Sequence, residues 1–104
     1  MEIEELRATF GKLQEHSKVE AMVGLETDVS KMEAIVRSAL KLKSIEDLYV
    51  VTGDYDLLIK VKCQSYEDFE FLLVNQIGKI PGIQKLKTML ILSQRKANGE
   101  IKGE

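Results

Sequence analysis

The stretch Val51-Thr52-Gly53-Asp54-Tyr55-Asp56 decides the fold, because apolar residues flank it on both sides, from Leu48 to Val51 and from Leu57 to Val61. Glycine adopts positive φ without steric cost and aspartate tolerates it, whereas the flanking apolar residues favour strands. The stretch therefore predicts a β-hairpin with a polar tip. Taken alone it is a weak functional signal, since most Gly-Asp turns are only turns.

Further elements are predicted on both sides of the hairpin. Apolar and polar residues alternate over 18–26, as in a strand, and apolar residues recur at spacings of three and four from Val29 to Lys43, as in an amphipathic helix that Asp28 or Ser30 can cap. A second helix opens at Ser65-Tyr66-Glu67-Asp68 and ends near Gly78. The predicted strands are Lys18–Glu26, Ile45–Thr52, Tyr55–Cys63 and, after a break at Ile80-Pro81-Gly82-Ile83, Leu86–Ser93.

The resulting order, β-α-β-β-α-β, contains an internal duplication. One constant shift along the chain superimposes the apolar positions of the two helices and places Met32 on Phe69 and Ile35 on Leu72. Right-handed crossovers in the two βαβ halves bring both helices to one face of the sheet. The sequence thus predicts an α+β, ferredoxin-like fold with a four-stranded antiparallel sheet.

Length and composition fit one globular domain. The 104 residues are 44% hydrophobic and 31% charged, and the formal net charge of −2 gives no whole-chain attraction to nucleic acid. No apolar run is long enough to cross a membrane, and Glu2, Glu4 and Glu5 stand where a signal peptide would be basic, so we expect a cytoplasmic protein. Four lysines are interpreted as a solvated face: Lys41, Lys43, Lys85 and Lys87.

The face of the sheet that the helices leave uncovered is predicted to be apolar. In a monomer this face should be mostly polar, and an exposed apolar patch usually marks an interface. We therefore expect a homodimer whose two sheets face each other as a closed α/β barrel, although some of these residues can instead cover a strand end or meet the N-terminal segment. The predicted interface residues are Met22, Tyr49, Val51, Leu58, Met89 and Ile91.

Three motifs together resemble the ligand-binding domain of the leucine-responsive and asparagine-responsive (Lrp/AsnC) transcription regulators, also called the RAM domain. They are the hairpin sequence of residues 50–61, the break Ile80-Pro81-Gly82-Ile83, and Thr88 leading into Met89-Leu90-Ile91-Leu92. They occur in the right order, and the resemblance covers about Val19 to Arg95. It implies the same βαββαβ fold, pairing through the sheets, and association of dimers into larger assemblies.

The resemblance also implies an effector site. In the family an amino acid binds between dimers near the hairpin turn, so the implied contacts are Thr52, Gly53, Asp54, Tyr55 and Asp56, with Thr88 as a further candidate whose role can be purely structural. Backbone N–H groups around Gly53 would donate to an α-carboxylate, and Asp54 or Asp56 would pair with the α-ammonium. Of the two, Asp56 is expected to serve ligand charge more than folding.

The sequence departs from full-length regulators at its N-terminus. Those proteins carry a helix-turn-helix domain before this one, and only about 17 residues precede the first predicted strand here. We expect residues 1–17 to be an amphipathic helix that docks on its own domain or on a neighbouring subunit, or else a remnant linker; residues 18–95 to be the RAM domain; and residues 96–104 to be a polar tail. The expected function is a stand-alone effector-binding and oligomerisation module that does not bind DNA itself and acts through a helix-turn-helix partner.

Catalysis is the alternative, because dimeric α/β barrels also host small enzymes. Such chemistry needs a titratable acid or base in a pocket, a metal cluster or a cofactor motif. His16 is the only histidine, and Cys63, the only cysteine, is interpreted as a buried structural thiol. The sequence has no His/Cys cluster with ligand spacing and no phosphate-binding glycine loop. We expect no enzyme, metal or cofactor; a structural assembly protein and a small enzyme stay open as alternatives.

Overall fold

The computed structural model describes residues 18–102, so the predicted N-terminal helix or linker (residues 1–17) and residues 103–104 lie outside the described residues. Regular elements follow one another closely along the described part. In chain order they are β1 (Val19–Thr27), a 3-10 turn (Val29–Lys31), α2 (Met32–Leu40), β2 (Ile45–Val50), β3 (Leu57–Cys63), α3 (Tyr66–Phe71) continued by a π-helical turn (Leu72–Gln76) and a 3-10 turn (Ile77–Lys79), β4 (Ile83–Leu90), β5 (Lys96–Ala97) and β6 (Glu100–Ile101).

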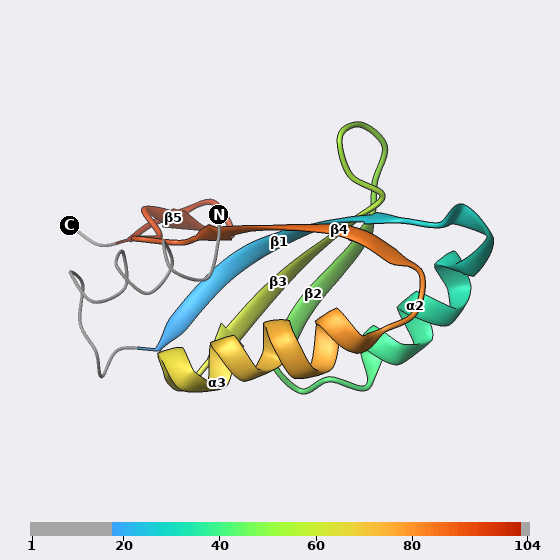
Figure 1. Cartoon of the computed structure of the whole chain (residues 1–104). Coiled ribbons are helices and arrows are strands. Elements are labelled where there is room, and N and C mark those ends of the chain that lie inside the picture. The colour runs from blue at the N-terminus through green and yellow to red at the C-terminus, as the bar shows by residue number, and fades with distance from the viewer. Residues whose placement is uncertain (1–17, 103–104) are drawn as a thin grey trace.

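Four strands form one sheet in the order β2-β3-β1-β4, and both helices lie on the same side of it (Figure 1). The central strand β1 pairs antiparallel with β3 on one side and with β4 on the other, and β2 pairs antiparallel with the outer side of β3. This topology confirms the predicted ferredoxin-like α+β fold.

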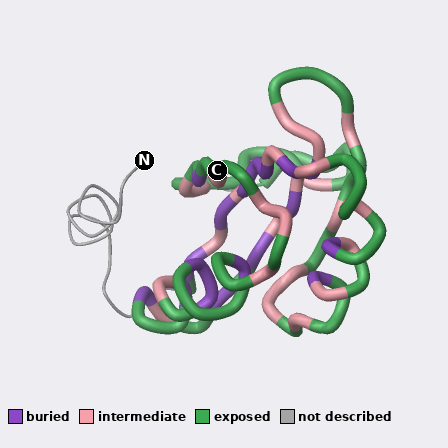
Figure 2. Tube along the Cα trace, turned by 45° about the vertical axis from the view of Figure 1, so that its right-hand side comes forward, coloured by how far each residue is buried: buried purple, intermediate pink, exposed green. Residues whose placement is uncertain are grey.

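The core lies between the sheet and the helices. Every second side chain of β1, from Val19 to Thr27, is buried, and β3 shows the same period from Leu57 to Cys63. Phe69 and Ile35, which belong to the two helices, are fully buried against this face. Figure 2 shows the resulting alternation of buried and partly exposed positions along the central strands. One face of the sheet is thus closed, and the other, called the open face below, carries no helix of residues 18–102 (Figure 1).

The hairpin has shorter strands and a longer connection than predicted. β2 ends at Val50 and β3 begins at Leu57, so residues 51–56 all belong to a loop that projects from the sheet (Figure 1). The Val51 N–H donates to the Asp56 carbonyl (3.0 Å), and the Asp56 N–H donates to the Leu25 carbonyl of β1 (2.9 Å). Asp56, the last residue of the loop, is therefore already hydrogen-bonded to β1 one residue before β3 begins.

The last strand begins and ends earlier than the predicted Leu86–Ser93. Gly82, with a φ of 100°, makes the turn before β4, and its carbonyl accepts a hydrogen bond from the Asp28 N–H (2.8 Å). This bond holds the chain beside the end of β1, so that pairing starts at once with Thr27 opposite Ile83. The start of this edge strand is set by its pairing with β1 and not by its apolar content, which is why the sequence pattern missed it.

Side-chain caps begin the 3-10 turn that leads into α2 and the helix α3, whereas α2 itself has no side-chain cap. The Asp28 carboxylate accepts from the Ser30 hydroxyl (2.8 Å) and the Ser30 N–H (3.1 Å), and these bonds hold the pKa of Asp28 below its ordinary value. Ser65 accepts from the Asp68 N–H (3.1 Å), as predicted. The first helix ends at Leu40, short of the predicted Lys43, because bonds between residues three apart tighten its last turn.

The predicted polar tail of residues 96–104 contains a short hairpin, β5–β6. Its turn residues, Asn98 and Gly99, have φ angles of 50° and 82°. Positive φ at both central residues is the geometry that the Asn-Gly pair favours in two-residue hairpins. The Asn98-Gly99 pair is therefore the sequence signal for this element.

Thr88 provides a test of core packing. It lies opposite Val23 on the closed face and is 2% exposed, and its hydroxyl is buried without a hydrogen-bond partner in the described part of the chain. Burying an unpaired hydroxyl costs about 1–3 kcal/mol, and valine fills nearly the same volume. We expect Thr88→Val to raise the free energy of unfolding by about 1 kcal/mol in chemical denaturation.

The matched control is Val23→Thr, which places a hydroxyl at the neighbouring position on β1. Because Val23 is fully buried, this change should lower the free energy of unfolding by about 1–3 kcal/mol. A Thr88→Val protein less stable than wild type would show that the hydroxyl has a partner in solution.

Candidate functional site

The loop between β2 and β3 is fastened to the end of β1. The Thr27 N–H donates to Oδ2 of Asp56 (2.8 Å), and the Thr27 hydroxyl lies 3.5 Å from the same oxygen. Thr27 is 5% exposed, so its N–H would be buried without an acceptor if the carboxylate were removed. This geometry gives Asp56 a folding role, whereas the sequence favoured a role in ligand charge.

The aromatic ring of Tyr55 lies over the open face of the sheet. A Cβ atom added to Gly24 of β1 would lie only 2.8–2.9 Å from atoms of this ring. Such a distance is shorter than any ordinary van der Waals contact, so the ring rests directly on the Gly24 backbone. Gly24 is thus the position in β1 that makes room for the loop to fold back onto the sheet.

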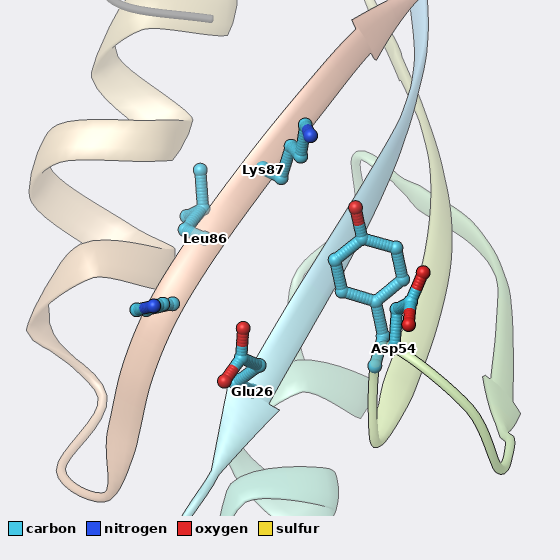
Figure 3. Close-up of a pocket in the computed structure, with 6 residues that line it drawn as sticks. Glu26, Asp54, Leu86 and Lys87 are labelled. Atoms are coloured by element: carbon cyan, nitrogen blue, oxygen red, sulfur yellow. The ribbon is translucent and has the colours of Figure 1, made fainter.

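An open cleft of about 530 Å³ lies beside the ring of Tyr55. Figure 3 shows the carboxylates of Glu26 and Asp54 on the side of β1 and the loop, with Lys87 across from them on β4. In the β1–β4 register, Glu26 lies opposite Lys85 and Gly24 lies opposite Lys87. The residues that line the cleft are Glu26, Asp54, Tyr55, Lys85, Leu86 and Lys87.

The cleft combines two acidic and two basic side chains. Within residues 18–102 none of these four forms an ion pair with another residue, whereas Lys60, elsewhere on the open face, lies within 4 Å of both Glu20 (3.7 Å) and Glu46 (3.5 Å). Within the described residues, the charged groups of the cleft are therefore not neutralised by ion pairs. An ammonium near the carboxylates and a carboxylate near the lysines would each meet opposite charge, so the arrangement suits a small zwitterion.

The predicted effector residues do not all gather at this cleft. Asp54 and Tyr55 line it, whereas Thr52 and Gly53 are exposed elsewhere in the loop. Gly53 has the positive φ expected from the sequence (128°), and a Cβ added there would meet nothing within 4 Å. Thr88 lies on the closed face, on the other side of the sheet from the cleft.

Three charged residues of the cleft were missed by the sequence prediction. Lys85 and Lys87 were interpreted as part of a solvated face, and Glu26 was only the end of a predicted strand. With β4 beginning at Ile83, the alternation of a strand places Lys85 and Lys87 on the same face. Their spacing of two was the available signal, but it could be used only once the strand boundary was known.

The open face carries the residues predicted for dimerisation. Met22 lies opposite Met89, and Tyr49 lies opposite Leu58. Tyr49 and Met89, on the two edge strands β2 and β4, are 52% and 44% exposed, and large apolar side chains exposed on a sheet face are typical of an interface. Val51 follows β2 and Ile91 follows β4. Both of these predicted interface residues are partly buried.

A second open cleft, of about 350 Å³, lies at the opposite end of β3 beside Cys63. Cys63 is 3% exposed, and burial raises the pKa of its thiol. A neutral, buried thiol is a poor nucleophile, which agrees with the structural role predicted for it. Within the described residues, no group of three or more His, Cys, Asp or Glu side chains is placed to hold a metal ion, and no helix is long and apolar enough to cross a membrane.

Comparison with known proteins identifies relatives of one kind. The sequence model of the Lrp/AsnC ligand binding domain matches residues 20–101. The HTH-type transcriptional regulator FL11 of Pyrococcus abyssi is 28% identical over 81 residues, which are 78% of this chain and 53% of that protein. The chain thus spans about half the length of the curated relatives it matches. These relatives are transcription regulators and not enzymes.

Solved structures agree with this comparison. The crystal structure of FFRP-DM1 is similar with a TM-score of 0.67 and 30% identity, covering 70% of this chain and 97% of that one. The transcriptional regulator NMB0573 of Neisseria meningitidis, solved as a complex with L-Met, has a TM-score of 0.73 at 15% identity and covers 81% of this chain and 56% of that one. The second likeness is one of fold alone.

The two aspartates of the loop should differ in their effect on stability. Asp56→Ala removes the acceptor of the buried Thr27 N–H, and we expect the free energy of unfolding to fall by about 1–3 kcal/mol. Asp54→Ala alters an exposed residue and should change it by less than about 0.5 kcal/mol. Thermal and chemical unfolding of both variants measure the difference. Equal stability of the two variants would refute a structural role for Asp56.

Proposed function

This chain belongs to the Lrp/AsnC ligand binding domain family, and we propose that it senses a free amino acid or a closely related zwitterion. The observation that carries the proposal is the cleft beside the loop, where two carboxylates and two lysines without ion-pair partners in the described part of the chain line one open space. The family match supports an effector-binding role. The charges of the cleft narrow the proposed effector to a small molecule that carries both a positive and a negative charge.

The proposed ligand binds through both of its charged groups. Asp54, supported by Glu26, pairs with the α-ammonium, because the carboxylate of Asp56 is already engaged by Thr27. Lys87 or Lys85 pairs with the α-carboxylate. Charge-assisted hydrogen bonds of this kind contribute about 1.5–3 kcal/mol each. A related fold solved with L-Met bound is consistent with a ligand of this class.

In this proposal the other predicted loop residues take part only in a contact between dimers. Thr52 and Gly53 lie at the exposed tip, where the backbone has open space around it. We propose that a neighbouring dimer approaches the tip, so that the backbone N–H groups there face a ligand held between dimers. We propose no ligand contact for Thr88, because it is buried on the closed face.

The regulatory readout is proposed to be association. Two copies pair through their open faces, burying apolar side chains such as Tyr49 and Met89 at roughly 25 cal/mol per Å² of apolar area removed from water. A ligand that binds one assembly better than another shifts the population toward it. Residues 18–102 contain no helix-turn-helix unit, and the net charge of −2 does not favour DNA, so we propose that DNA is contacted through a helix-turn-helix regulator associated with this domain.

Calorimetric titration with each of the twenty amino acids tests the proposed ligand class. At least one should bind wild type, and Asp54→Asn should weaken that ligand about ten- to a hundredfold by removing one charge-assisted contact. Glu33→Gln is the control, because Glu33 is also an exposed carboxylate and lies on α2, away from the cleft and from the open face. Unchanged affinity of a folded Asp54→Asn protein would place the ammonium contact elsewhere.

Sedimentation of open-face variants tests the proposed pairing of sheets. Leu58→Lys combined with Met89→Lys places two ammonium groups in the apolar part of the open face, and we expect monomers where wild type forms dimers. Val29→Lys combined with Leu40→Lys is the control, since both residues are exposed apolar positions outside the sheet. A double open-face variant that sediments like wild type would exclude this face as the interface.

A further inference from the structure

The C-terminal hairpin is a formed element with an ordered turn. β5 and β6 pair through Lys96 opposite Ile101 and Ala97 opposite Glu100, and the Lys102 N–H donates to the Arg95 carbonyl (2.9 Å). The hairpin forms a two-stranded sheet of its own, separate from the main one. It extends past the end of β4, away from α2 (Figure 1).

This hairpin lacks the contacts that such an element needs. Each strand has two residues, and an isolated two-stranded hairpin is marginally stable at best in water unless a hydrophobic surface supports it. From 91 to 102 no residue is buried, and two large apolar side chains, Leu92 and Ile101, are 67% and 69% exposed. The geometry is thus that of an arm whose apolar residues have no partner in residues 18–102.

The open face leads directly into this arm. The Ile91 N–H donates to the Glu20 carbonyl of β1 (2.8 Å), so pairing with the central strand continues one residue beyond β4. Met89 and Ile91 therefore carry the apolar surface to the residue next to Leu92. The match to the ligand binding domain family runs to residue 101, so the arm is part of the matched domain.

We propose that residues 91–102 form an arm that packs on a second copy of this chain, with Leu92 and Ile101 buried against the partner's open face. Two-fold symmetry would place two such arms in each dimer, because both subunits use the same patches in such a contact. The inference rests on the proposed pairing of open faces and adds a specific surface to it. The occupant is a second copy because the arm directly follows Met89 and Ile91, which belong to the face on which that copy is proposed to lie.

Hydrogen exchange of the full chain at two protein concentrations tests the arm. In the dimer the Lys102 N–H should exchange slowly, and dilution below the dissociation constant should bring it to the rate of an exposed amide. Amides of β1 should stay protected in both samples, since β1 pairs on both sides within one chain. Protection of Lys102 that does not change with dilution would overturn the proposal, because the arm would then be held by its own chain, for example by residues 1–17.

Substitution of the two apolar residues provides a second measurement. Leu92→Ser combined with Ile101→Ser should raise the dimer dissociation constant at least about tenfold in sedimentation equilibrium. The matched control, Val29→Ser combined with Leu40→Ser, removes two equally exposed apolar residues outside the arm and should leave the constant unchanged. The arm lies outside the core, so the substituted chain is expected to fold normally.

The outcomes separate this inference from the proposed function. If the arm variant dimerises as tightly as wild type while Leu58→Lys with Met89→Lys gives monomers, the arm is excluded and the pairing of open faces stands. If wild type is monomeric at every concentration tested, both are overturned. Loss of amino acid binding without a change in dimerisation bears only on the cleft.

Discussion

The cleft and the loop beside it are positioned by β1, which lies inside the sheet between β3 and β4. Its backbone pairs with β3 on one side and β4 on the other, and β1 and β4 are the two strands whose side chains line the cleft. The same strand then fixes the loop, because its end supplies the Leu25 carbonyl to Asp56 N–H and the Thr27 N–H to the Asp56 carboxylate. Each of these polar backbone groups lies at a buried residue, where an unmade hydrogen bond is costly.

A second consequence of this central strand is the contrast between its two faces. The closed face packs against the helices, and β1 has a buried side chain there at every second position. No helix of residues 18–102 packs on the open face. The ring of Tyr55 therefore occupies the space that a side chain at position 24 would need. A residue with a side chain at this position would push the ring away and change the wall of the cleft, although no charged group would be altered.

The sequence predicted those parts of the molecule in which local pattern and tertiary structure agree. The order of elements, the caps at Asp28 and Ser65 and the positive φ of Gly53 follow from periodicity and local chemistry. The start of β4 does not, because it depends on the bond between Asp28 and Gly82, which are far apart in the chain. Lys85 and Lys87 were not predicted as site residues for the same reason. Their closeness to Glu26 depends on the register between β1 and β4, which the sequence does not give. The bond between Asp56 and Thr27 was not predicted either, because Thr27 lies in another strand.

The ring of Tyr55 joins the two surfaces on which the proposed function depends. It lines the cleft, and it also lies over β1 on the open face, beside the positions at which a second sheet would pack. In the proposed function, a ligand that contacts the ring and a partner that packs near it would act on one side chain, and any coupling between the two binding events would be reciprocal. A coupling of 1–3 kcal/mol, typical of allosteric proteins, corresponds to a 5- to 150-fold change in affinity. Asp56, the residue after Tyr55, is bonded to β1 through both its N–H and its carboxylate, so the ring is attached to the chain next to a point that is fixed to the sheet.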